Sequence, residues 1–270
     1  MADSLAGIVL AAGAGTRLMP LTTRLPKALC PVGDRPMLDH AVARLAPVLD
    51  PAAGSIAVNA HHRARTVVEH VQMTWPGVHV QVEQPVALGT AGAVGNLRPW
   101  IDGRPVVVVN ADAQHEADLA RFVGAWDRER VAVLTTTPGA FGPQSTVLAS
   151  LLPPQLVAGL RADPSGLWEV VWRNEVELGR LQTVHCDAEF IDCGTPGSYL
   201  RANLEWAGRG GLWVHPEASV GAEIAESVVG RGAVVEGTIE RCVVWPGSTV
   251  HGGEHLRDAI RASDITVLVR

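Results

Sequence analysis

The chain has 270 residues, 47% of them hydrophobic and 19% charged, a composition typical of a globular protein with a full core. Its net charge is −6 and its arginines are scattered without forming a basic stripe, which argues against nucleic acid as a partner. No apolar stretch approaches the roughly 18 residues of a membrane span, and Asp3 stands where a signal peptide would carry positive charge, so we expect no membrane partner.

The first half of the chain alternates short β-branched runs with amphipathic stretches. This alternation predicts an α/β fold with right-handed crossovers and a Rossmann-like, mostly parallel sheet. Strands are expected over residues 6–10, 56–59, 78–82, 106–110 and 131–135, and helices over residues 37–45, 64–75, 90–97 and 117–126. Thr90 is the expected entry residue of the third helix. A glycine loop follows the first strand and Asp112 follows the fourth, so both should project from the carboxyl edge of the sheet.

The C-terminal part carries a 15-residue repeat. Residues 220–234 align with residues 235–249, so that Val220 matches Val235, Ile224 matches Ile239, and a third copy begins at Val250. Three β-branched positions per repeat, separated by small or turn residues, predict a three-sided β-solenoid. A pair of ordinary hairpins is the alternative. The tail has only two to three turns of such a solenoid, so we expect it to pack on the main domain or on another subunit.

Lys27 is the only lysine among 22 basic residues, and it lies close to a glycine loop. Residues 10–18 read LAAGAGTRL, and Pro26-Lys27 follows eight residues later. Glycines let backbone N–H groups point at phosphate oxygens, and a lysine ammonium is a flexible point charge suited to following such an oxygen. The spacing is neither that of a dinucleotide fingerprint nor that of a P-loop, so the loop is a phosphate cradle of another kind.

These residues resemble the signature of the sugar-1-phosphate nucleotidyltransferases. The resemblance continues through NAHH at 59–62, LGTAGA at 88–93, NAD at 110–112, IDCGTP at 191–196 and YLRAN at 199–203. It implies a Rossmann-like nucleotidyltransferase domain followed by a short left-handed β-helix. It also implies transfer of a nucleotidyl group from an NTP to a sugar 1-phosphate, with release of pyrophosphate. The LGTAGA block is most similar to the mannose-1-phosphate guanylyltransferases, which makes GTP and mannose 1-phosphate the first expectation for the substrates.

The resemblance also implies roles for particular residues. Arg17 would hold the β- and γ-phosphates, Lys27 would neutralise the α-phosphate, and Asp112 and Asp192 would hold Mg²⁺. Gln84 would contact the base, because a side-chain amide offers a donor and an acceptor together. The remaining nucleotide-binding positions implied are Leu10, Ala11, Ala12, Gly13, Gly15, Thr16, Gly89 and Thr90. Adjacent His61 and His62 are interpreted as structural.

The sugar side departs from the family pattern. The usual Glu-Lys-Pro segment that contacts the sugar phosphate is missing, and residues 138–146 look like a shortened sugar-binding segment. The metal motif reads Asn-Ala-Asp, with Ala111 where glycine is usual.

Three interpretations follow. The first, which we favour, is an active enzyme in which Arg173, Glu175 or Gln144 replaces the lost contacts. The second is a nucleotide-sugar-binding subunit with little catalysis. The third is a hexapeptide-type acyltransferase, suggested only by His215, His251 and His255 in the tail.

The expected domains are a nucleotidyltransferase domain over residues 1–208 and a β-solenoid with its tail over residues 209–270. The four cysteines, Cys30, Cys186, Cys193 and Cys242, have the spacing of neither a zinc site nor a disulfide framework. We expect buried, reduced thiols in a cytoplasmic protein, and a homo-oligomer that covers the flank of the solenoid.

Overall fold

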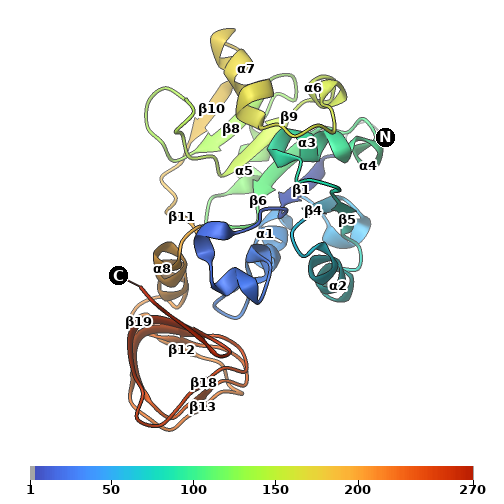
Figure 1. Cartoon of the computed structure of the whole chain (residues 1–270). Coiled ribbons are helices and arrows are strands. Elements are labelled where there is room, and N and C mark those ends of the chain that lie inside the picture. Colours follow the sequence, from blue (N-terminus) through green and yellow to red (C-terminus); the bar gives the residue numbers. More distant parts are fainter. Residues whose placement is uncertain (1–3, 270) are drawn as a thin grey trace. The chain divides into compact units, whose positions relative to one another are not determined.

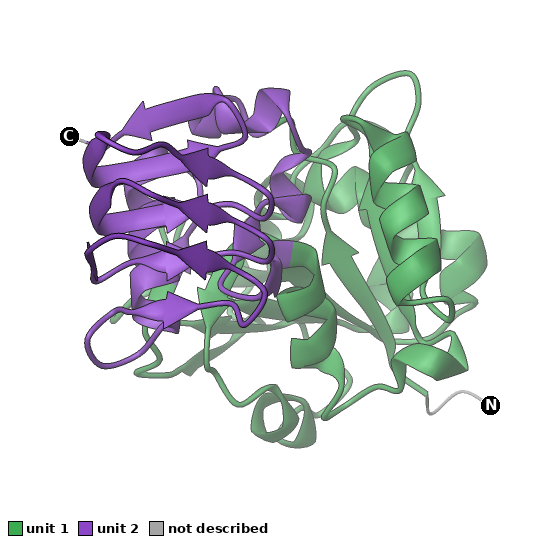
Figure 2. Ribbon diagram, turned by 90° about the horizontal axis from the view of Figure 1, so that it is seen from below, with its two compact units in different colours: residues 1–14, 38–190 green, residues 15–37, 191–270 purple. Residues whose placement is uncertain are grey.

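The computed structural model describes residues 4–269, which form two compact units (Figure 2). Within the described residues, the first unit comprises residues 4–14 and 38–190. The second comprises residues 15–37 and 191–269. These units are defined by how compactly their residues pack, which does not test the expected domain boundary. The boundary near residue 208 therefore stays a prediction.

The first unit is built on a seven-stranded sheet in the order β10-β8-β9-β6-β1-β4-β5 (Figure 1). Its strands are β1 (Ala6–Leu10), β4 (Ile56–Ala60), β5 (His79–Val82), β6 (Val106–Asn110), β8 (Ala132–Thr135), β9 (Ala149–Leu152) and β10 (Gln182–His185). Neighbouring strands are parallel except where β9 pairs with β6 and β8. β1 and β6 are nearly continuous apolar runs, because a parallel strand covered on both faces has no solvent side.

Helices connect the strands of this unit. They are α1 (Met37–Leu45), α2 (Ala64–Thr74), α3 (Gly89–Asn96), α4 (Arg98–Ile101), α5 (Leu119–Gly124), α6 (Pro154–Gly159) and α7 (Arg173–Glu177). A π-helix over Trp168–Trp172 leads directly into α7. The short elements that remain are η4 (Pro51–Ala53) and β7 (Ala113–His115).

The predicted strands and helices of this half are confirmed, with ends that differ by a few residues. β1, β6 and α1 have the predicted limits. The antiparallel strand β9 and the π-helix were not predicted. One prediction is wrong: Thr90 does not cap α3, which begins at Gly89, and its hydroxyl accepts a hydrogen bond from the Leu167 N–H instead (2.7 Å).

The second unit joins a short N-terminal segment to the C-terminal part of the chain. The segment contains the short helices η1 (Thr16–Leu18), η2 (Leu21–Thr23) and η3 (Lys27–Leu29), then a hairpin of β2 (Pro31–Val32) and β3 (Arg35–Pro36). The C-terminal part begins with β11 (Phe190–Asp192) and α8 (Pro196–Trp206). Its strands continue as β12 (Trp213–Val214), β13 (Ser219–Val220), β14 (Ile224–Ala225), β15 (Val228–Val229), β16 (Val234–Val235), β17 (Thr238–Val244), β18 (Thr249–Val250), β19 (His255–Ala262) and β20 (Ile265–Leu268).

The strands from β12 to β19, which we call the coil, pair in parallel with the predicted 15-residue offset. Val220 lies opposite Val235, Ile224 opposite Ile239, and Val235 opposite Val250. Between β17 and β19 the offset grows to 17 residues, because Cys242 lies opposite Ala259. Figure 1 shows these strands nearly end-on, as three sides that meet at corners.

One corner of the coil repeats a left-handed backbone conformation. Glu226, Arg241 and Asp258 have φ values of 41°, 52° and 47°, a region that non-glycine residues seldom occupy. Their side chains link successive levels, since Arg241 lies 3.3 Å from Glu226 and 2.8 Å from Asp258. The repeat therefore sets both the strand register and the charge pattern of this corner.

The second unit has two hydrophobic clusters. One lies within the coil and includes Val229, Val235 and Ile239. The other joins the N-terminal segment, α8 and residues of the coil, and contains Leu18, Tyr199 and Trp245. Residues 15–37 thus share a core with the coil.

No helix in the stretch from residue 4 to residue 269 combines the length and apolar character needed to cross a membrane.

Candidate active site

Three residues lie side by side on neighbouring strands at the carboxyl edge of the sheet. Leu10, the last residue of β1, lies opposite Asn59 of β4 on one side and Asn110 of β6 on the other. Ala11 and Ala12 follow Leu10 and are buried, and Gly13 after them is exposed. The predicted phosphate loop therefore leaves the sheet at its centre, where ligands of open α/β sheets bind.

A buried hydrogen-bond network fixes this edge, and it was missed from the sequence. The Ala11 N–H donates to Asn59 Oδ1 (2.7 Å), and Asn59 Nδ2 donates to Glu83 Oε1 (2.7 Å). Glu83 Oε2 accepts from the Leu88 N–H (2.8 Å), although the Glu83 side chain is only 1% exposed. The network ties the start of the phosphate loop to the loop that bears Gln84. The sequence shows only a glutamate one position before an expected ligand, whereas its burial, which requires several donors, is seen in the structure alone.

The predicted base-contacting positions lie beyond this network. Gln84 and Gly89 are exposed, and Thr90 is half-buried at the start of α3. Segment 161–167 packs directly on this helix: the Ala91 and Gly92 N–H groups donate to the Ser165 carbonyl (3.0 and 3.4 Å). A Cβ at Gly92 would lie 2.2 Å from the Asp163 carbonyl oxygen, so only glycine allows this approach.

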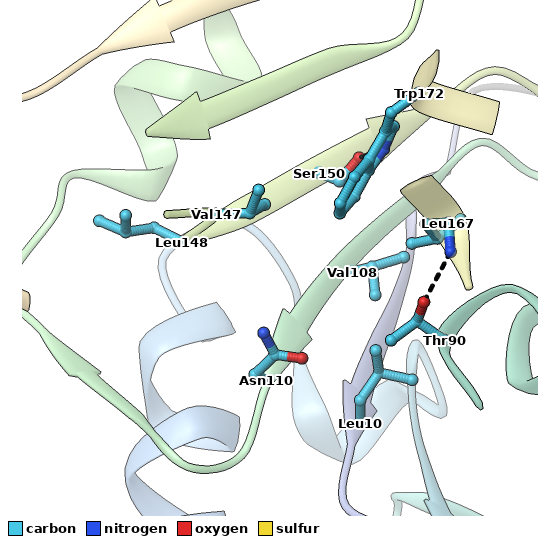
Figure 3. A pocket seen from close by; sticks show the side chains of 9 residues that line it. All are labelled: Leu10, Thr90, Val108, Asn110, Val147, Leu148, Ser150, Leu167 and Trp172. Atoms are coloured by element: carbon cyan, nitrogen blue, oxygen red, sulfur yellow. Dashed lines mark hydrogen bonds between the residues drawn. The ribbon is translucent and has the colours of Figure 1, made fainter. Parts of the chain in front are cut away.

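A cavity of about 280 Å³ opens beside these residues (Figure 3). Most of its lining is apolar, its polar groups are amide and hydroxyl, and none of its nine residues carries a charge. The lining residues are Leu10, Thr90, Val108, Asn110, Val147, Leu148, Ser150, Leu167 and Trp172. Trp172 is held in place because its Nε1–H donates to Ser150 Oγ (3.2 Å).

The residues expected to replace the missing sugar-side contacts do not line this cavity. Glu175 is buried, and both of its carboxylate oxygens accept hydrogen bonds from the Arg180 guanidinium (2.8 and 3.0 Å). Arg173 and Gln144 are exposed. The structure therefore corrects the expectation for Glu175, because its carboxylate neutralises Arg180 within the same helical region.

In the second unit, the lysine segment (residues 15–37) is built closely around Lys27. Gly15 has a φ of 64°, and a Cβ there would lie 2.8 Å from both Lys27 Cβ and Thr22 Cγ2. Thr22 Oγ1 donates to the Gly15 carbonyl (3.0 Å). Glycine is required at position 15 by its left-handed conformation and by the lysine stem packed against it. The second half of the glycine loop and the lone lysine thus form one local structure.

Asp192 brings the two predicted phosphate-binding cations together. Its Oδ2 lies 3.3 Å from Arg17 Nη2 and its Oδ1 lies 3.5 Å from Lys27 Nζ. The Lys27 side chain is 10% exposed, whereas Arg17 is 68% exposed and Asp192 46% exposed. A largely buried ammonium and an exposed guanidinium on one carboxylate make a strongly polar site that can accept an anion.

α8 begins at Pro196, four residues after Asp192, and its cap residue Thr195 forms a capping box. Thr195 Oγ1 accepts from the Ser198 N–H (3.2 Å), and Ser198 Oγ accepts from the Thr195 N–H (3.1 Å). Thr16 is exposed beside Arg17 at the start of η1. The position of Asp192 is therefore defined on one side by β11 and on the other by a firmly capped helix.

Asp112 lies in the turn between β6 and β7 of the first unit, half-buried, as its place after a strand predicted. Ala111 before it is buried and has no positive φ, so the alanine is compatible with this turn. Among residues 4–269, no group of three or more His, Cys, Asp or Glu side chains could hold a metal ion.

The cysteines and His61 have the following surroundings. All four thiols are free, and Cys30, Cys193 and Cys242 are buried, whereas Cys186 is half-buried. Burial raises the pKa of the Cys30 thiol to about 12, so this thiol of the lysine segment remains protonated. His61 Nδ1 forms a hydrogen bond with the Glu83 carbonyl (3.0 Å). In the tail, His215 Nδ1 accepts from the Glu217 N–H (3.0 Å) within a turn.

Comparison with known proteins agrees with this geometry. A family model described as nucleotidyl transferase matches residues 6–141, half of the chain. The chain therefore belongs to the nucleotidyltransferase family, among the sugar-1-phosphate nucleotidyltransferases.

The names of its relatives give different substrates. It is 32% identical over 151 residues to an N-acetylmuramate alpha-1-phosphate uridylyltransferase from Caulobacter vibrioides, covering 52% of this chain and 61% of the relative. It is 29% identical to a mannose-1-phosphate guanyltransferase from Schizosaccharomyces pombe, covering 72% and 62%. It is also 29% identical to a mannose-1-phosphate guanylyltransferase from Mycobacterium tuberculosis, covering 91% and 81%. The matches thus span less than two thirds of the first two relatives.

Solved structures share the fold. HddC from Yersinia pseudotuberculosis, complexed with GMP-PN, superimposes with a TM-score of 0.58 at 20% identity, covering 76% of this chain and all of that one. At this identity the likeness establishes the α/β nucleotidyltransferase fold alone.

Proposed function

We propose that this chain transfers a nucleotidyl group from an NTP to a sugar 1-phosphate and releases pyrophosphate. The observation that carries the proposal is the convergence of Arg17 and Lys27 on Asp192, with Gly15 packed against the lysine stem. Phosphoryl-type transfer depends on positioning and on neutralising charge, and these residues supply both.

In the proposed reaction a sugar-phosphate oxygen attacks the α-phosphorus of the NTP, and the bond to the β-phosphate oxygen breaks. Lys27 would neutralise charge at the α-phosphate, and its burial keeps the ammonium partly dehydrated, which strengthens its attraction for phosphate. Arg17, which is more exposed, would hold the β- and γ-phosphates and brace the leaving pyrophosphate. The N–H groups of the loop from Gly13 to Thr16 would bind phosphate oxygens.

Mg²⁺ is the proposed cofactor, with Asp112 and Asp192 as its protein ligands. Carboxylate oxygens suit this hard cation, which usually completes its coordination with substrate phosphates and water, and when bound it would offset charge on the phosphates. Asp192 fits the role because its carboxylate is half-exposed and already accepts two cationic groups. The two aspartates belong to different compact units. Asp112→Asn and Asp192→Asn should each raise the Mg²⁺ concentration that gives half-maximal activity.

The uncharged cavity lined by Asn110 and Trp172 is the proposed site of the sugar ring. Trp172 offers an apolar face for the C–H side of a pyranose, and Asn110 and Thr90 offer polar groups for its hydroxyls. The resemblance to the family gives Lys27 the separate role of neutralising the incoming sugar phosphate. GTP and mannose 1-phosphate remain the first substrates to test, with the names of two relatives in support.

The test is pyrophosphate release from each of the common NTPs with a panel of hexose 1-phosphates and Mg²⁺. We expect release with one nucleotide and one sugar class. Binding of a nucleotide sugar without pyrophosphate release across the panel would favour a binding subunit. Acetyl transfer from a CoA thioester would favour an acyltransferase.

We further propose that the coil is a left-handed β-helix and that the protein is a cytoplasmic homo-oligomer. The 15-residue register of the strands supports the first point, and the free thiols support a reducing compartment. Light scattering gives the mass in solution, and a monomeric mass would contradict the oligomer.

A further inference from the structure

The lysine segment shares its hydrophobic core with the coil. Leu18, Leu21 and Val32 are fully buried in one cluster with Trp245 and Ile260. The residues that precede and follow Lys27 are therefore held by apolar contacts with the C-terminal part of the chain.

A chain of hydrogen bonds links the coil to the lysine segment. Trp245, at the end of β17, donates its Nε1–H to Tyr199 Oη of α8 (2.9 Å). Tyr199 Oη in turn donates to the Pro31 carbonyl, four residues beyond Lys27. Tyr199 is the only tyrosine in the chain and has no exposed surface. Burial raises its pKa well above the usual value, so the hydroxyl stays protonated and continues to donate.

A second connection runs through the β2–β3 turn. The Gly33 N–H donates to Asn203 Oδ1 (2.9 Å), and the Trp206 ring occupies the position where a side chain at Gly33 would begin. Trp206 meets Trp213 of the first coil strand edge-on, with ring centroids 5.2 Å apart. The start and the turn of the hairpin that follows Lys27 are thus held by α8, and Tyr199 and Trp206 of α8 each contact a tryptophan of the coil.

We propose that the coil is a scaffold that positions Lys27, acting through Trp245, Tyr199 and Pro31 and through Trp213, Trp206 and Gly33. This inference rests on the proposed function, in which the ammonium must meet the α-phosphate. Short helix η3 joins Lys27 to the hairpin, since the Cys30 N–H donates to the Lys27 carbonyl (3.0 Å). A displacement of the hairpin is therefore passed to the lysine backbone. Tyr199 and Trp245 are positioning residues in this scheme, because they touch no substrate.

Tyr199→Phe tests the proposal, because it keeps the ring and removes the hydroxyl. Since Lys27 is the only lysine, the rate at which an acetylating reagent modifies the peptide containing it reports the shielding of one ε-amine. We expect faster acetylation of Lys27 in Tyr199→Phe. We also expect kcat for pyrophosphate release to fall about tenfold or more with little change in KM for the NTP, because small misplacements of a charged group cost rate. Trp245→Phe should act in the same direction, and it replaces Tyr199→Phe if that variant does not fold.

Ile239→Val is the matched control, because it removes a methylene from the core of the coil without touching the lysine segment. It should lower the thermal midpoint and leave Lys27 acetylation at the wild-type rate. Wild-type acetylation in both Tyr199→Phe and Trp245→Phe, or an equal increase in Ile239→Val, would overturn the scaffold. Acetylation of Lys27 does not depend on catalytic turnover. If the wild-type protein released no pyrophosphate, the proposed function would be contradicted, but the acetylation rates would still test the scaffold.

Discussion

The lysine segment and the uncharged cavity differ in how they meet a ligand. In the lysine segment, two cations share one carboxylate, and the backbone is held by a glycine turn, a shared core and two hydrogen-bonded ties. The cavity has no charged residue in its lining, and its shape depends on Trp172 and on segment 161–167 packed against α3. In the proposed reaction, charge neutralisation would be concentrated in one compact unit and recognition of the sugar's shape in the other.

The strongest test of this contrast removes the ammonium. Lys27→Ala should lower pyrophosphate release by about 10²-fold or more, as expected for loss of one preorganised charge contact. Lys27→Arg should not restore the rate, because the larger planar guanidinium has little room in a side-chain position that is only 10% exposed and cannot follow a phosphate oxygen as a compact ammonium does. Initial rates at saturating NTP measure both variants. Activity near wild type in Lys27→Ala would remove the basis of the charge assignment.

Acid should weaken the first unit through His115. Burial, with a smaller contribution from Arg44, lowers the His115 pKa to about 3. The unfolded chain takes up this proton below a pH of about 6.5 while the native state does not until about pH 3, so the free energy of unfolding should fall through that window by up to about 1.4 kcal/mol per pH unit. Urea titrations at pH 7, 6 and 5 measure it. His115→Gln should flatten the slope, and exposed His251→Gln should keep it; equal slopes in all three proteins would contradict the assignment.

A substitution in the cavity should change KM for the sugar 1-phosphate and no other kinetic constant. Trp172→Ala should raise KM for the sugar 1-phosphate about tenfold, the worth of roughly 1.4 kcal/mol of lost contact, and leave KM for the NTP unchanged. Trp168→Ala is the control, because Trp168 lies in the same π-helix and contacts Phe141 but does not line the cavity. If both variants change the two constants alike, the cavity is not the sugar site.

The smallest expected effect is the loss of stability on removing a helix cap, which can be compared for two helices. Thr195→Ala removes the cap of α8 and Asp118→Ala removes that of α5, and each should cost about 1 kcal/mol. Thermal midpoints should fall by similar amounts, about 2–4 °C each. Only Thr195→Ala should also speed acetylation of Lys27, because α8 carries Tyr199. The same acetylation rate in both variants would place the lysine segment outside the influence of α8.

Much of the fold could be predicted because its signals are local. The apolar runs of β1 and β6 have the predicted limits, and the repeat in which Val220 matches Val235 appears as strand register. β9 was missed because its four residues follow a segment that was interpreted as shortened. In addition, no predicted helix precedes this antiparallel strand, so the alternation of strands and helices did not indicate it. The role given to Thr90 as a helix cap was wrong because its hydroxyl has a distant partner, the Leu167 N–H.

By itself the sequence determined the class of fold and the family, because alternating apolar runs and the motif around the glycine loop are local patterns. Only the tertiary structure decided how those residues are held. The Asn59–Glu83 network, the cavity around Trp172 and the ties from Trp245 and Asn203 to the lysine segment join residues far apart in the chain. Such contacts follow from packing, since a buried polar group must find its partner wherever the fold brings one.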